Sequence, residues 1–173
     1  PGCRQVVSGS ATFYGHERSG EAVARAVLER LKYPNETIEK VGRLVRRHMF
    51  AVPETPKGLR RLISKTGVAG VYDLIELRRA DIRAQGRDEE AVDPALDQLE
   101  LAVTEEIHRN PPFALKDLRI NGQDVMSEFS LPPGPEIGRA LEHLLEYVLD
   151  DPRRNTREAL LDEAARLLSR PQP

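Results

Sequence analysis

Apolar side chains recur at steps of three and four residues along nearly the whole chain, the spacing that gathers them on one face of an α-helix. The first such face is formed by Ala22, Val23, Ala26, Val27 and Leu31. No run of residues alternates between apolar and polar as a half-buried strand would. The pattern predicts an all-α fold of about eight helices in two packed lobes with no sheet, with apolar faces within residues 22–31, 38–49, 59–63, 71–82, 96–107, 121–126, 137–149 and 160–168.

Prolines and capping residues mark the breaks between these helices. Asp93-Pro94 is typical of an N-cap followed by proline at the first helical position, and Asn155 and Glu158 have the spacing of a capping box. Asn110-Pro111-Pro112 cannot continue a helix, so we predict a boundary at this point. The expected domains are a truncated helical body over residues 1–109 and a helical tail over residues 110–173.

The composition is that of a soluble globular chain. Of its 173 residues, 39% are hydrophobic and only 5% aromatic, without tryptophan, so aliphatic side chains must fill the core. No apolar run approaches the ~20 residues of a membrane span, and no secretory leader opens the sequence. The lone cysteine, Cys3, excludes an intrachain disulfide and fits a reducing compartment. We expect a cytoplasmic protein that makes no contact with membranes.

Charge is distributed unevenly, although the net charge is only -2. Residues 40–65 carry eight lysines and arginines against Glu54 alone, whereas residues 88–106 carry acidic side chains without a lysine or arginine. A basic stripe of this kind is typical of a nucleic-acid-binding face, but equally of a solvated helix surface.

The basic residues fall into two helical rows that are candidates for binding RNA phosphates. Within each row the cations stand three and four residues apart, and the scarcity of aromatic residues favours contact with a duplex backbone over stacking on single-stranded bases. The two rows are Arg43, Arg46 and Arg47, followed by Lys57, Arg60, Arg61 and Lys65.

A glycine-containing turn at Gly134–Gly138 is a further candidate, because it opens a helix whose first backbone N–H groups have no partner within the helix. A tight turn that packing requires explains the same residues equally well.

Two histidines and an aspartate could come together as metal ligands. His16 and His48 lie near opposite ends of consecutive predicted helices, and Asp81 on a later helix could add a carboxylate. The alternative is a capping or structural role for the histidines, and we expect no metal at this place. The sequence contains neither a P-loop nor a GxSxG nucleophile motif.

Several stretches together resemble one family. They are Phe13-Tyr14-Gly15-His16-Glu17, Leu44-Val45-Arg46-Arg47-His48-Met49, Leu74–Asp81, Phe113–Met126, Gly134–Leu141 and Asn155–Glu158. In this order and spacing they resemble the HD-type body and tail of bacterial CCA-adding tRNA nucleotidyltransferases and of the related A-adding enzymes and poly(A) polymerases.

The resemblance implies a modular enzyme whose head holds the catalytic carboxylates and Mg²⁺, and whose helical body and tail hold the acceptor stem and T arm of tRNA. The head and neck motifs do not occur in this sequence, so we expect a tRNA-binding region without catalytic residues or a cofactor of its own, with the missing head and neck as partner. Lys116, Arg119, Asn121, Gly134 and Gly138 would then meet the elbow side of the tRNA. The alternatives are a metal-dependent HD-type phosphohydrolase and a structural or dimerising helical module. The sequence does not distinguish CCA, A or poly(A) addition, and it does not fix the oligomeric state.

Overall fold

The computed structural model describes residues 4–7, 10–13, 15–84 and 89–169, and the chain divides into two compact units. Unit 1 consists of Pro1–Val52 and Ala69–Glu100, and unit 2 consists of Pro53–Val68 and Leu101–Pro173. The chain therefore passes from one unit to the other three times. The division into domains at residues 109 and 110 stays a prediction, and Cys3 lies outside the described residues.

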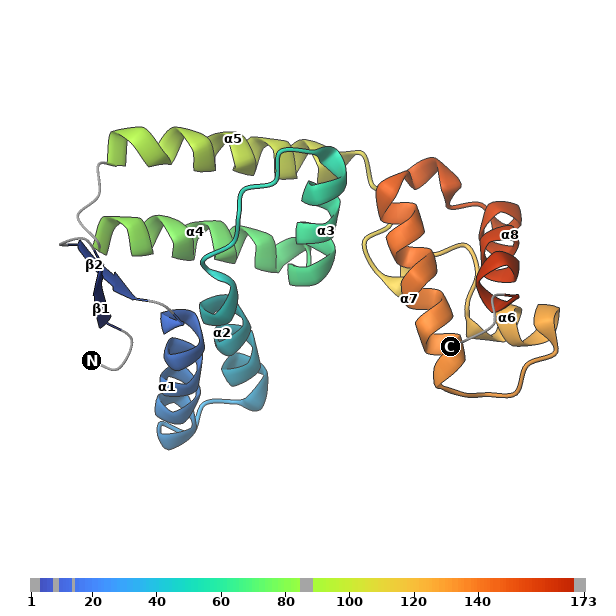
Figure 1. Ribbon diagram of the computed structural model, residues 1–173, viewed down its shortest axis with the longest axis horizontal. Coiled ribbons are helices and arrows are strands. Elements are labelled where there is room, and N and C mark those ends of the chain that lie inside the picture. Colours follow the sequence, from blue (N-terminus) through green and yellow to red (C-terminus); the bar gives the residue numbers. More distant parts are fainter. Residues whose placement is uncertain (1–3, 8–9, 14, 85–88, 170–173) are drawn as a thin grey trace. The chain divides into compact units, whose positions relative to one another are not determined.

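Eight α-helices, coloured in chain order in Figure 1, make up most of the described part of the chain, which confirms the predicted all-α class. Unit 1 contains strands β1 and β2 and helices α1, α2, nearly all of α4 and the first part of α5, while unit 2 contains the rest. Their bounds are β1 Arg4–Val7, β2 Ser10–Phe13, α1 His16–Arg30, α2 Asn35–Arg47, α3 Pro56–Thr66, α4 Val68–Ala84, α5 Glu89–His108, η1 Leu115–Asp117, α6 Gly122–Phe129, α7 Pro135–Asp150, η2 Pro152–Arg154 and α8 Arg157–Leu168.

Strands β1 and β2 were not predicted. They form a two-stranded antiparallel hairpin in which Arg4 pairs with Phe13 and Val7 with Ser10. Each strand has only four residues, which is too short for an alternating pattern to stand out in the sequence. Within the described part of the chain, no helix has both the length and the apolar character that a membrane span requires.

Helices α1 and α2 lie side by side as an antiparallel hairpin (Figure 1). Glycine allows their close approach, because a Cβ at Gly20 would lie 3.2 Å from Val45 Cγ1. A Cβ at Gly42 would likewise lie 2.7 Å from the Arg25 guanidinium, which donates to Glu39 Oε1 at 2.6 Å. The two helices are thus joined along a seam of small residues and ion pairs.

The apolar face that the sequence shows on α1 is exposed. Val23, Val27 and Leu31 have 63%, 39% and 58% of their surface accessible, and none of the described residues of α1 is buried. Glu21 and Arg25 of α1 pair with Arg46 and Glu39 of α2, and by helical spacing these two residues lie on a different side of α1 from Val23.

The start of α5 also differs from the prediction. The helix begins at Glu89, so Asp93 is not its N-cap and Pro94 lies inside it. The residues before Pro94 include Glu89, Glu90 and Ala91, which are good helix formers and carry the helix in the N-terminal direction. Further along α5, Asp97 and Glu100 both accept hydrogen bonds from Arg79 of α4, at 2.6 and 2.9 Å.

Unit 2 has an apolar core in which α6, α7 and α8 pack together. Its buried members are Leu118, Ile120, Val125, Ile137, Leu144, Val148, Leu160 and Ala164. The cap of α8 is Thr156, whose hydroxyl accepts from the Ala159 N–H at 3.2 Å, so the predicted capping box on Asn155 is wrong by one position.

Candidate nucleic-acid interface

The first predicted cation row lies at the C-terminal end of α2. Arg43 and Arg47 are exposed there, and Arg46 is partly exposed with its Nε 3.9 Å from Glu21 Oε2. A pair at that distance on an accessible surface is weak. The negative end of the helix dipole also favours cations at this place. The structure therefore presents this row toward solvent, as a phosphate-binding surface requires.

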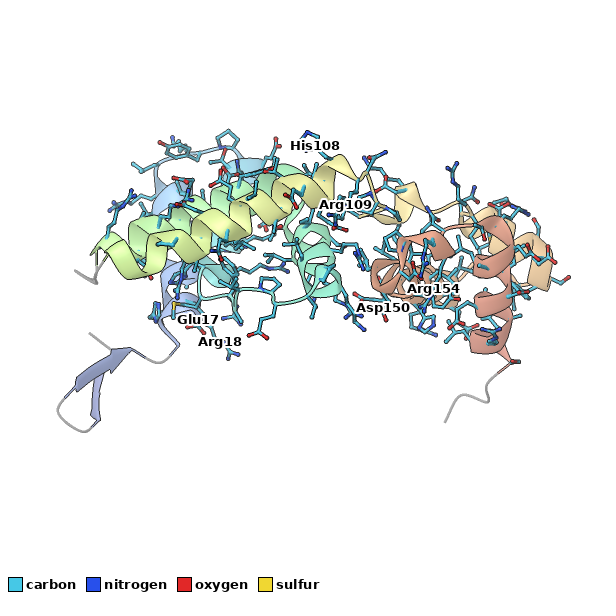
Figure 2. All side chains as sticks on the ribbon, turned by 90° about the horizontal axis from the view of Figure 1, so that it is seen from above. Glu17, Arg18, His108, Arg109, Asp150 and Arg154 are labelled. Atoms are coloured by element: carbon cyan, nitrogen blue, oxygen red, sulfur yellow. The ribbon has the colours of Figure 1, made fainter. Side chains whose placement is uncertain are left out.

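The second row, on α3, is occupied by contacts within unit 2. Lys57 Nζ lies 3.0 Å from Asp150 Oδ2. Arg61 donates to Glu146 at 2.6 Å and to Asp150 Oδ1 at 2.8 Å, and the hydrogen bond from Glu146 raises the pKa of the Arg61 guanidinium. Asp150, labelled in Figure 2, is the last residue of α7. These two cations hold the end of α7.

Arg60 is buried, which contradicts its prediction as an RNA contact. Its Nε donates to the Leu149 carbonyl at 2.6 Å, Nη2 to the Asp150 carbonyl at 2.9 Å, and Nη1 to the buried carboxylate of Glu106 at 2.9 Å. Two of these acceptors are carbonyls at the C-terminus of α7 that have no partner within the helix. The guanidinium therefore serves the fold. Arg60 lies three residues before the buried Ile63, on the apolar side of α3, and this position is the feature of the sequence that could have predicted its burial.

Lys65 lies exposed in the last turn of α3, and Lys116 and Arg119 lie exposed in and just after η1. Asn121, another predicted contact, is the N-cap of α6: its Oδ1 accepts from the N–H groups of Gln123 and Asp124, at 2.8 and 3.2 Å. Its side-chain oxygen is therefore used within the protein.

The Gly134–Gly138 turn opens α7 as predicted. Gly134 is the N-cap and has extended backbone, and no side chain caps the helix there. A Cβ at Gly134 or Gly138 would meet nothing within 4 Å, so the approach to the first N–H groups of α7 is open on that side.

The histidine pair forms as the antiparallel packing predicted. His16 Nε2 lies 3.0 Å from His48 Nε2, with the ring planes at 65°, and Asp81 Oδ2 lies 3.9 Å from His48 Nε2. His48 Nδ1 is 2.7 Å from the Val45 carbonyl, to which it must donate, so the Nε2 of a neutral His48 accepts from His16. Among the described residues, no group of three His, Cys, Asp or Glu side chains is arranged to hold a metal ion.

A cavity of about 700 Å³ in unit 2 has Lys116 and Arg119 in its lining. The sequence did not predict it, because Asn110-Pro111-Pro112 was interpreted only as a boundary. These three residues line the cavity, and Pro111 and Pro112 are buried.

The fold is mostly helical, and of the two predicted cation rows the one on α2 lies on its surface. The sequence matches the family described as tRNA nucleotidyltransferase domain 2 over residues 13–164, and the chain belongs to that family. This confirms the resemblance found in the sequence.

Relatives among characterised proteins carry matching names. The chain is 37% identical to a CC-adding tRNA nucleotidyltransferase of Thermus thermophilus, over 80% of this chain and 30% of the relative. It is 28% identical to an A-adding tRNA nucleotidyltransferase of Deinococcus radiodurans, over 83% of this chain and 33% of the relative. A CCA-adding enzyme of Lactococcus lactis is 32% identical over 42% of this chain and 20% of the enzyme. The chain thus spans about a third of the first two relatives, and no solved structure matches it.

Proposed function

We propose that the chain is the tRNA-binding body and tail region of a tRNA nucleotidyltransferase of the CCA-adding, A-adding or poly(A) polymerase type. The observation that carries this proposal is the family match over residues 13–164. The names of the two relatives with the greatest coverage both specify nucleotide addition to tRNA. Catalysis and the Mg²⁺ ions that it requires would belong to the part of the longer relatives that this chain does not match.

The surface row on α2 is the best placed part of the chain to hold a tRNA backbone. Arg43, Arg46 and Arg47 project from the last turns of one helix, where guanidinium groups can pair with successive phosphates. Such contacts position the RNA without reading its sequence, as a protein that accepts many different tRNAs requires. Lys57, Arg60 and Arg61 leave the proposed set, because they are held by α7, Glu106 or both, and the exposed Lys65 is the member of the α3 row that is kept.

Fluorescence anisotropy with labelled tRNA at 50 and 200 mM salt tests this proposal. If the row and its neighbours neutralise about five phosphates, affinity should fall on the order of 10²- to 10³-fold between the two conditions. Reversal of the row by Arg43→Glu, Arg46→Glu and Arg47→Glu should weaken binding of all tRNAs alike. The matched control is Arg18→Glu with Arg30→Glu, which reverses two exposed arginines of α1. Absent or salt-indifferent binding contradicts the proposal, and a defect confined to one tRNA indicates base readout.

A metal-dependent HD-type phosphohydrolase is the second candidate, because His16 Nε2 lies 3.0 Å and Asp81 Oδ2 3.9 Å from His48 Nε2. Elemental analysis of the purified chain and a phosphodiesterase assay with Ni²⁺ or Mn²⁺ separate the two candidates. Stoichiometric metal and activity that are both lost in His16→Ala would support the hydrolase. A metal-free, inactive protein that still binds tRNA would exclude it.

A further inference from the structure

The cavity in unit 2 is built from segments that are distant in the sequence. Its lining comes from the end of α3, the end of α5, the segment of residues 110–119 and Asn155. The members that matter for its chemistry are Ser64, Ile107, Phe113, Lys116, Arg119 and Asn155.

Hydrogen bonds hold the polar part of the cavity wall in place. The Asp117 carboxylate accepts from the N–H groups of Phe113 and Ala114, at 3.1 and 2.9 Å. The Asn155 side chain accepts from the Arg119 N–H and donates to the Asp117 carbonyl, both at 3.0 Å. Because these groups are already paired, the wall is ordered before any ligand arrives.

Lys116 and Arg119 differ from the other cations of unit 2. Neither side chain forms an ion pair or hydrogen bond with any residue that the structure describes. The other described lysines and arginines of unit 2 all have such a contact; they are Lys57, Arg60, Arg61, Lys65, Arg109, Arg139, Arg153, Arg154, Arg157 and Arg166. Two unpaired cations at one cavity indicate an anionic ligand.

The lining also has an apolar part. Phe113 and Ile107 are half-buried, and Pro111 and Pro112 are buried. An aromatic residue in the same lining as two cations suits a ligand that combines a flat apolar group with a phosphate, which is the chemistry of a nucleotide. At about 700 Å³ the cavity has room for one nucleotide but cannot admit a duplex.

We propose that this cavity binds one unstacked nucleotide of a bound RNA. The phosphate pairs with Lys116 and Arg119, and the base lies against Phe113 and Ile107. The inference rests on the proposed function and adds a base-binding site in unit 2 to the backbone contacts of α2. It directs unit 2 to an unpaired part of the RNA, because only a loop, a bulge or a single-stranded end presents a base outside the stack.

An abasic scan tests the inference with the whole 173-residue chain. The probe is a labelled minihelix with an acceptor stem and T arm, in which each unpaired nucleotide of the loop and of the 3′ end in turn lacks its base. In the wild type, one position should lower the affinity about 5-fold or more, the loss expected for one base-stacking contact. Ser64→Phe, which fills the cavity from α3, should bind the intact probe more weakly and lose its sensitivity to that position. Ala114→Trp fills it from the opposite segment and replaces Ser64→Phe if thermal unfolding shows that the latter is not folded.

The two cations of the cavity, Lys116 and Arg119, are tested by a separate pair of variants. Lys116→Ala with Arg119→Ala should weaken binding, whereas Arg139→Ala with Arg166→Ala removes two exposed cations of the same unit outside the cavity and should have little effect.

The outcomes separate the two proposals. If the wild type binds no RNA, the proposed function fails and this inference fails with it. If the wild type binds but no abasic position matters, or Ser64→Phe keeps the same abasic profile, the cavity is not a base site and the proposed function stands. Saturable binding of AMP as tight as that of the minihelix would overturn the RNA assignment in favour of a free nucleotide.

Discussion

At the scale of single residues, Arg60 and its partner Glu106 show that a row of charged residues in a sequence does not reveal which of them are buried. Arg60 stands among Lys57, Arg61 and Lys65 and has the same helical spacing, yet its side chain is buried and theirs are not. Spacing identifies which residues share a face of a helix but not whether another helix covers that face. The partner that covers Arg60, the end of α7, is 89 positions away in the chain. For the same reason Asn155 could not be assigned from its neighbours, because it bonds to residues 117 and 119.

Removal of Glu106 should be costly. Glu106→Ala leaves the Arg60 guanidinium buried without its counter-charge, and we expect a loss of about 3–5 kcal/mol in the free energy of unfolding, measured by urea denaturation. Arg109→Ala is the control, because Arg109 pairs with the other carboxylate oxygen of Glu106 from an exposed position and should cost at most about 1 kcal/mol. Equal losses in the two variants would contradict a specific role for the buried pair.

At the scale of elements, the helices were the predictable part, and their contacts were not. All eight predicted apolar patterns overlap an observed helix, and six of them begin within three residues of its start, since steps of three and four are a local signal. The start of α5 and the hairpin of β1 and β2 were missed, the first because proline usually opens a helix and the second because the strands are short. The apolar stripe of α1 was found, but its exposure depends on which side of α1 contacts α2, which no local pattern reveals.

The exposed stripe of α1 should tolerate polar residues. Val23→Gln, Val27→Gln and Leu31→Gln together should change the free energy of unfolding by only about 0.5 kcal/mol, since these side chains are already accessible. Leu74→Ala, at a fully buried position of α4, should cost about 2–5 kcal/mol in the same thermal or urea measurement. A loss in the triple variant as large as that of Leu74→Ala would mean that the stripe is covered.

The link between α6 and α8 should depend on pH. Arg157 of α8 donates to Asp124 of α6, and this hydrogen bond, with a further one from the Asn121 N–H, lowers the pKa of the Asp124 carboxyl below its usual value. A carboxyl whose pKa is lowered on folding stabilises the folded state above its unfolded pKa, and this contribution disappears as the pH falls through the folded pKa. Asp124→Asn should therefore be less stable than wild type at neutral pH, and the difference should vanish in strong acid. Urea midpoints measured across that range check this, and a difference that does not change with pH would refute it.

At the scale of the whole molecule, fold class and family were accessible from the sequence, and the surface proposed to bind RNA was accessible only in part. The family match and the eight helices agree with what residue patterns predicted. The α2 row also lies on the surface, as the prediction requires. The cavity was not predictable, because it arises where α3, α5 and the segment around η1 meet, and no local pattern encodes that meeting.

The predicted tail can be tested as a fragment. Residues 110–173 contain the whole apolar core of α6, α7 and α8, so the fragment should be helical by circular dichroism. It lacks Arg60 and Glu106, so its urea midpoint should lie below that of the same helices in the complete chain. An unfolded fragment would show that the boundary at residue 110 does not delimit an independent domain.

Unit 2 is formed by two segments that are far apart in the sequence, and this has a consequence for synthesis on the ribosome. Helix α3 is made early, but Leu149, which accepts from Arg60, follows 89 residues later. At about 5–20 residues per second, α3 waits roughly 4–18 s for the end of α7 to be translated. During that interval the apolar side chains of Leu59 and Ile63 and the charge of Arg60 lack their final neighbours on α7, so the nascent chain passes through a defined window in which a chaperone could bind α3.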